Sequence, residues 1–134
     1  MIFAGSMEEL KTEIDFIHSS GALQHVHSPY EFTNSLIGLH AKWILVSRMM
    51  FNENDRDFVT VQKSFLSANG PGKLPQGYTD KPIMYPHTTL SFQKFNSTIL
   101  NKGYEAEWMF SEAPGSYQRK NEKIIEKGLL YIRK

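Results

Sequence analysis

The chain contains no cysteine. This absence excludes a disulfide-linked scaffold, a zinc or iron–sulfur site held by thiolates, and a cysteine nucleophile. It leaves the redox compartment open and is compatible with the cytoplasm. The first six residues, MIFAGS, have neither a basic region nor a long hydrophobic run, so we expect no signal peptide in the chain.

Long apolar runs and an excess of one charge are missing as well. No apolar run is longer than that at 43–46, and a membrane span needs about 18 such residues. Lys and Arg number 15 and Asp and Glu number 14, so bulk charge does not favour binding to nucleic acid. What is present, 134 residues of which 40% are hydrophobic, is typical of one globular domain without a membrane span.

Hydrophobic spacing predicts a short helix followed by strands. Ser6 and Glu9 have the spacing of a capping box, and apolar residues then recur at helical intervals over about 7–18. Farther on, apolar and polar residues alternate with the period of a strand, in the segments 41–51, 58–65, 88–95 and 104–110. The polar turn between the first two segments predicts that they pair as a hairpin. The charged stretch 116–128 is either a helix or part of a hairpin that turns at 127–128, before a strand at 129–132.

These patterns predict a mainly β fold, an antiparallel sandwich or barrel with a short N-terminal helix. The alternative is an α+β fold with a helix packed on an antiparallel sheet. We expect a single domain, with the helix in 1–20, a β-rich core in 21–110 and a C-terminal extension in 111–134. The segment 41–51 is apolar on both faces, which indicates either a buried central strand or the seam of an oligomer. Aromatic rings on the strand faces are expected to fill the core, namely Trp43, Phe51, Phe65, Phe92, Trp108 and Phe110.

One long loop is expected at 67–82, because glycine and proline there prevent a helix or a ladder from continuing. Recognition tends to concentrate on loops carried by a rigid scaffold. We therefore predict ligand contacts from residues in or beside this loop, namely Lys73, Tyr78, Tyr85 and His87.

A first histidine motif suggests a metal site. His25 and His27 would project from the same face of a strand, and Glu31 follows four residues later with a carboxylate. The pattern His-x-His-x-x-x-Glu with Gly38 behind it resembles the first metal motif of the cupin family. That resemblance implies a jelly-roll barrel that binds a divalent metal.

A second motif begins at His87. The run His87-Thr88-Thr89-Leu90 resembles half of the signature of two-histidine phosphoesterases, in which an imidazole acts as acid or base. An acid–base ribonuclease would combine His87 with Arg48 and with Glu105 or Glu107. If His25, His27 and His87 converged, they would form a ligand set for zinc, manganese or iron. No nucleophile elbow and no phosphate-binding glycine loop occur.

The stretch 21–110 resembles the CUB domain, a small antiparallel β-sandwich of extracellular proteins. The resemblance rests on short strand motifs, with Ala41 where a partner cysteine of the family's first pair would stand. They are Ala41-x-Trp43-x-Leu45, Asp57-Phe58-Val59-Thr60-Val61, Leu90-Ser91-Phe92 and Gly103-Tyr104-Glu105-Ala106-Glu107-Trp108. It implies an extracellular binding module without catalytic activity.

We therefore predict a non-catalytic interaction module without a cofactor, which recognises a protein or small ligand through the loop 67–82 and the adjoining strand ends. One alternative is a small hydrolase or phosphoesterase around His25, His27 and His87, with or without a divalent metal. Another is a viral or bacterial accessory protein that sequesters a nucleotide or inhibits a partner enzyme.

Overall fold

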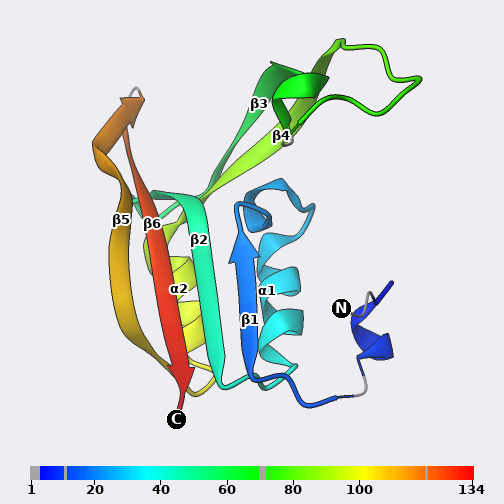
Figure 1. The fold of residues 1–134 in the computed structure, drawn as a ribbon. Helices are drawn as coiled ribbons and strands as arrows, with labels where there is room; N and C mark the ends of the chain where they lie inside the picture. Colours follow the sequence, from blue (N-terminus) through cyan, green and yellow to red (C-terminus); the bar gives the residue numbers. More distant parts are fainter. Residues whose placement is uncertain (1–3, 11, 70–71, 120) are drawn as a thin grey trace.

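A computed structural model of the chain describes residues 4–10, 12–69, 72–119 and 121–134, with the backbone alone for residue 8 and for 114–119. It contains six strands and two α-helices (Figure 1). Their bounds are β1 Phe16–Ser20, α1 Pro29–Ile37, β2 Trp43–Asn52, β3 Phe58–Phe65, β4 Pro82–Ser91, α2 Phe92–Leu100, β5 Tyr104–Arg119 and β6 Glu122–Arg133. Three short 3-10 helices accompany them, η1 Met7–Glu9, η2 Leu23–His25 and η3 Leu66–Asn69.

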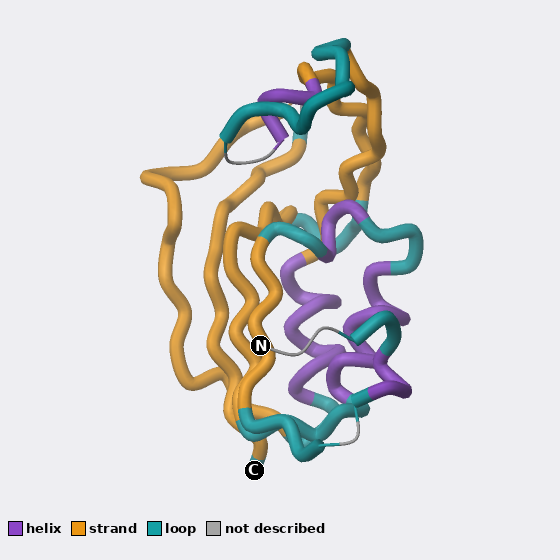
Figure 2. The backbone as a smooth tube through the Cα atoms, turned by 45° about the vertical axis from the view of Figure 1, so that its right-hand side comes forward, coloured by secondary structure: helices purple, strands orange, loops and turns teal. Residues whose placement is uncertain are grey.

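The strands form one mixed sheet around β2. β6 pairs antiparallel with one edge of β2, and β5 pairs antiparallel with β6. The other edge of β2 is shared by two parallel strands: β1 pairs along 43–47, and the end of β4 pairs with Phe51 and Asn52. Both α-helices cover the same face of the sheet (Figure 2). The protein is therefore an α/β fold, and the predicted antiparallel sandwich or barrel is wrong, as is the α+β alternative.

Local sequence explains the two helices and the core between them and the sheet. Pro29 opens α1, where its missing N–H costs nothing, and Ser91 caps α2 by accepting a hydrogen bond from the Lys94 N–H at 3.2 Å. The helices bury residues four apart, Thr33 and Ile37 in α1 and Phe95 and Ile99 in α2. These meet buried residues of the strands, among them Ile44, Val46, Phe51, Leu90, Leu129 and Tyr131.

The strands β3 and β4 form a two-stranded arm that projects beyond the tip of β1 (Figure 1). The predicted strand at 58–65 is confirmed as β3 and that at 41–51 as β2, but the hairpin between them is wrong. β3 pairs antiparallel with β4 instead, from Phe58 opposite Thr89 to Phe65 opposite Pro82. Side chains in the 52–57 turn bind the end of β4, and this directs the chain away from β2.

Three other predicted elements differ from the structure. The described part of 7–18 is not an α-helix, because only η1 is helical and β1 begins at Phe16. The segment 88–95 is a strand only as far as Ser91, where α2 takes over. The C-terminal stretch is a hairpin of β5 and β6 and not a helix, but it turns between Arg119 and Glu122 and not at 127–128.

Two aromatic residues expected in the core lie on the surface. The side chain of Phe65 is 56% exposed, because the β3–β4 arm has no second layer over that face. Trp108 is 62% exposed and Met109 51%, because neither face of β5 is covered over 105–109. In contrast, Phe51 is fully buried. Within the described residues, no helix is long and apolar enough to cross a membrane.

Candidate functional site

A cavity of about 700 Å³ lies where β1 ends and β2 approaches its end. Ligands of open α/β sheets bind at the carboxyl ends of the strands, and cavities of this size hold small molecules. We call it the strand-end cavity. Its lining comes from β1, η2, β2, η3, β4 and β6 and the residue after β1: Ser20, Gly21, Gln24, His25, Arg48, Met50, Ala68, Asn69, Tyr85 and Glu126.

The turn after β1 forms one side of the cavity. Gly21 has φ +62° and its N–H donates to the Ser47 carbonyl at 2.9 Å, which ties the end of β1 to β2. A methyl group at Gly21 would lie 3.6 Å from the Arg48 carbonyl oxygen and 3.9 Å from Gln24 Nε2. Glycine is suited to this position because other residues avoid such a φ. Gln24 Oε1 in turn accepts a hydrogen bond from the Met50 N–H at 3.3 Å, so η2 is held against β2.

Arg48 enters the cavity from an irregularity in β2. The register with β6 shifts between Val46 and Met49, and Arg48 has φ +54°, which is uncommon for a residue other than glycine. The Glu112 carboxylate on β5 accepts the hydrogen bond of the Arg48 N–H. Bulges of this kind redirect side chains and are frequent next to active sites.

Two imidazoles and a phenol meet beside the cavity. The His25 ring centre lies 5.4 Å from that of Tyr85 and 5.2 Å from that of His87, both in edge-on geometry. His25 Nδ1 lies 3.3 Å from the Pro86 carbonyl oxygen, which only accepts, so the proton of neutral His25 is on Nδ1 and the lone pair is on Nε2. Tyr85 donates its hydroxyl proton to Asn69 Oδ1 at 3.0 Å. These contacts join η2, η3 and β4 around the cavity.

His87 itself is buried. It is 2% exposed, and its Nε2 has no hydrogen-bond partner among the described residues. Burial, and to a lesser extent the nearby His25, lower the pKa of His87 below its usual value. His87 is therefore neutral at physiological pH, and it shapes the wall behind His25.

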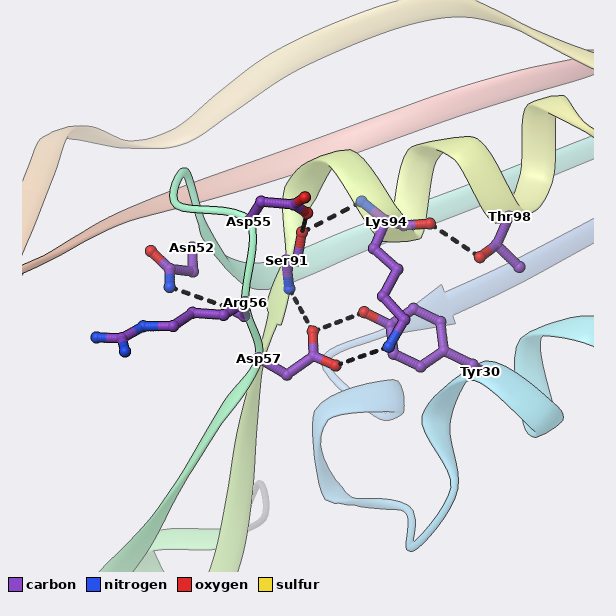
Figure 3. A network of polar contacts seen from close by, with 8 residues as sticks. All are labelled: Tyr30, Asn52, Asp55, Arg56, Asp57, Ser91, Lys94 and Thr98. Carbon is purple, nitrogen blue, oxygen red and sulfur yellow. Dashed lines mark hydrogen bonds and ion pairs between the residues drawn. The ribbon is translucent and has the colours of Figure 1, made fainter.

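A second polar cluster holds the base of the arm (Figure 3). Asp57, just before β3, accepts hydrogen bonds from the Tyr30 hydroxyl and the Ser91 N–H, both at 2.6 Å, and lies 3.4 Å from Lys94 Nζ. Burial by itself would raise the pKa of Asp57, but these bonds and the charge of Lys94 outweigh it and lower the pKa. Asp55 accepts from Ser91 Oγ at 3.1 Å. This cluster, which we call the Asp57 network, ties α1, α2, β3 and β4 together.

The structure brings some of the predicted ligand-binding residues to the cavity and leaves others outside. Tyr85 lines the cavity, and His87 lies behind His25. Lys73 and Tyr78 are exposed in the loop between η3 and β4, and Tyr78 is 66% exposed. Gly70 and Pro71 of the predicted loop lie outside the described residues.

The expected metal set is not assembled. His25 ends η2, so it does not share a strand face with His27, and Glu31 lies in the first turn of α1. In the part of the chain that the structure describes, no group of three or more His, Asp or Glu side chains could hold a metal ion. Of the acid–base set, Arg48 lines the cavity, whereas Glu105 lies at the opposite end of the sheet and pairs with Lys134 at 3.2 Å.

Sequence reasoning missed the rest of the lining. Gln24 and Glu126 belong to elements that were predicted wrongly or not at all, whereas Ala68 and Asn69 lie in the predicted loop 67–82 without having been singled out. The order of strand, glycine and helix in 16–37 could have indicated the site. This order is typical of a βα unit, and it predicts a ligand-binding position beside Gly21 at the end of a strand.

The fold is similar to that of known methyltransferases. The crystal structure of the glycopeptide N-methyltransferase MtfA complexed with (S)-adenosyl-L-methionine (SAM) aligns with a TM-score of 0.52 at 10% identity, covering 93% of this chain and 56% of that chain. An S-adenosylmethionine-dependent methyltransferase from Clostridium acetobutylicum has a TM-score of 0.48 at 9% identity, covering 92% and 60%. The chain thus spans little more than half the length of these proteins. No protein-family model and no curated protein sequence matches it.

These findings contradict the CUB-like interaction module. The short motifs that carried that resemblance lie on a mixed α/β sheet, and the fold is similar to that of MtfA and not to a β-sandwich. The predicted non-catalytic function, the hydrolase or phosphoesterase alternative and the accessory-protein alternative are not supported by this likeness to a methyltransferase.

Proposed function

We propose that this chain is the acceptor-binding part of a SAM-dependent methyltransferase. The observation that carries the proposal is the strand-end cavity, which lies at the carboxyl ends of parallel strands in a fold similar to that of MtfA with SAM. The acceptor is a small molecule, or part of one, that fits within about 700 Å³.

The residues of the β1–α1–β2 unit do not fit SAM itself. Dinucleotide-binding folds hold the cofactor over a glycine-rich turn, with an acidic side chain farther along that binds the ribose, and SAM carries an adenosine ribose of the same kind. Here the turn after β1 has the single glycine Gly21, and the charged residue that lines the cavity from β2 is the cation Arg48. We therefore assign SAM to a part of the enzyme other than this unit.

The open edge of β1 suggests where that part adds. Among the described strands β1 pairs with β2 alone, and its Phe16 is half exposed. An unpaired strand edge presents backbone N–H and C=O groups that can pair with a further strand. Because Ser20 and Gly21 of the same strand end line the cavity, a cofactor-binding part that extends the sheet at β1 would lie next to it.

His25 is suited to accept the proton of the acceptor. Methyl transfer to an N–H or O–H group releases a proton, and a positioned base assists such a reaction by about 10²- to 10⁴-fold. The bond from Nδ1 to the Pro86 carbonyl leaves Nε2 of neutral His25 as the basic atom, and His25 lines the cavity.

The test measures methyl transfer by the protein purified from the cells that produce it, through a tag on this chain, so that any attached or associated part is retained. The purified protein is incubated with tritiated SAM and a small-molecule extract of the same cells. We expect the tritiated methyl group to appear on a compound of that extract. His25→Ala should lower kcat at least 100-fold, with SAM binding unchanged, whereas the exposed His27→Ala should retain full activity. Absence of SAM binding, or an equal effect of the two substitutions, would refute the proposal.

A further inference from the structure

We propose that the strand-end cavity binds an oxyanion, a carboxylate or phosphate carried by the acceptor, through the guanidinium of Arg48. The proposal rests on the function above only in that it regards the ligand as a methyl acceptor. The oxyanion site itself belongs to this chain and can be measured without methyl transfer.

The charge of Arg48 is available. Its side chain is exposed to the cavity, and within the described part of the chain its guanidinium makes no ion pair. The Glu112 carboxylate binds the backbone N–H of Arg48 and not its guanidinium. Arginine presents a planar fork of donors that matches the oxygens of a carboxylate or phosphate.

Neighbouring groups add donors at the same place. Gln24 Oε1 is occupied by the Met50 N–H, so its Nε2 group is left to donate. That Nε2 and the Cβ of Arg48 lie 3.9 and 3.8 Å from the position that a Cβ of Gly21 would take. Gly21, Gln24 and Arg48 therefore converge on one corner of the cavity, and the missing side chain of Gly21 leaves that corner open.

The opposite charge in the cavity sets the direction of binding. Glu126 lines the wall on β6, where it is paired with Met50 in the sheet register. Its carboxylate repels an anion, so the oxyanion is held at the Gly21 corner and the uncharged or cationic part of the acceptor lies toward Glu126.

The backbone of Arg48 supports a functional role. A residue with a side chain pays a conformational penalty at φ +54°, which glycine avoids and asparagine tolerates best. Such strain persists where the surrounding structure enforces it and is concentrated at binding sites. If Arg48 were present for folding alone, asparagine would serve equally well.

The experiment titrates the purified chain with inorganic phosphate and, separately, acetate at constant ionic strength, following the backbone and Arg48 Nε resonances by NMR. We expect saturable binding that is centred on Gly21, Gln24 and Arg48. Arg48→Asn should weaken binding about 10-fold or more without lowering the unfolding temperature, because it removes charge-assisted hydrogen bonds but suits the backbone. The control Lys63→Gln removes an equal charge from the exposed face of β3 and should change nothing.

A second variant guards against a general effect on folding. Glu126→Gln should strengthen binding, since it removes the like charge from the same cavity. The proposal is overturned if neither anion binds saturably, if Arg48→Asn binds as tightly as the wild type, if Lys63→Gln loses as much, or if Glu126→Gln binds more weakly. The anion that binds more tightly shows whether the acceptor carries a phosphate or a carboxylate. Failure of methyl transfer alone would refute the function above and leave this site standing.

Discussion

Gly128→Ala should destabilise the protein, although alanine normally suits a strand better than glycine. Gly128 on β6 is paired with Phe110 on β5, whose ring lies over it. A Cβ at 128 would lie 2.1 Å from Cζ of that ring, and ordinary contact begins at 3.4 Å, so the ring must move by at least 1.3 Å (3.4 minus 2.1). The Trp108 ring, whose centre lies 5.1 Å from that of Phe110, blocks movement of the Phe110 ring on one side.

The magnitude follows from two opposing effects. Overpacking costs about 1–3 kcal/mol, and this contact lies toward the upper end. Replacing glycine in a strand recovers roughly 0.5–1 kcal/mol. We therefore expect a net loss of about 1–2 kcal/mol in the free energy of unfolding, measured by urea denaturation followed by circular dichroism.

The control is a double-mutant cycle with Phe110→Ala. Without the ring, Gly128→Ala should become neutral or stabilising by about 0.5 kcal/mol. An equal loss in both backgrounds, or no loss in the wild type, would show that Phe110 does not cover Gly128 and that the register of β5 and β6 is different.

Two further predictions concern titratable groups. His87→Phe should make stability less sensitive to acid. In the unfolded chain His87 binds a proton near the ordinary histidine pKa of about 6.5, whereas burial lowers the pKa of His87 in the folded protein. The wild type therefore loses stability as the pH falls below about 6.5, and the variant does not. Urea denaturation between pH 7 and 5 measures this, and parallel curves for the two proteins would contradict it. Asp57→Asn should cost about 1–3 kcal/mol at neutral pH, because charged hydrogen bonds to Tyr30 and Ser91 are lost. The pKa of Asp57 in the folded protein lies below its unfolded value near 3.9, so its stabilising effect is present above that value and is lost as the pH falls through the folded pKa. The difference in unfolding free energy between the variant and the wild type should therefore disappear in acid. A difference that is constant with pH would exclude this carboxylate as the cause.

Local patterns predicted strands but not their partners. The alternation in 58–65 identified β3, yet its pairing with β4 depends on bonds from Asp55 and Asp57, in the turn after β2, to Ser91, more than 30 residues farther along the chain. β1 has five residues and buries only Ile17 and Ser19, which is too little alternation to outweigh the helical spacing of its surroundings. Pairing between distant segments is not encoded in a short window, so the fold class was predicted wrongly from elements that were partly right.

The start of α2 could have been predicted. Ser91 precedes Phe92, Phe95 and Ile99, a cap followed by apolar residues at helical intervals. The preceding alternation in β4 obscured it, because strand and helix meet without a connecting loop.

Some residues of the candidate site could be predicted from the sequence and others could not. Tyr85 and His87 were predicted beside the loop and not on a strand; they are two residues apart on β4, so they share a face of it, and both lie at the site. Arg48 enters the cavity through a bulge and a positive φ, which no propensity predicts for an arginine. Its contribution depends on the folded backbone more than on the residue type.

The position of the β3–β4 arm determines the shape of the cavity, and few contacts hold it. An isolated two-stranded ribbon is marginally stable in water, and the outer face of this one exposes Val59, Val61 and Met84. The arm is rooted by the Asp57 network at one end, and His25 contacts β4 through Pro86, Tyr85 and His87 farther out. Because Tyr85 and, through η3, Asn69 reach the cavity from this arm, a change at its root would alter which acceptor fits while leaving the sheet and the end of β1 intact.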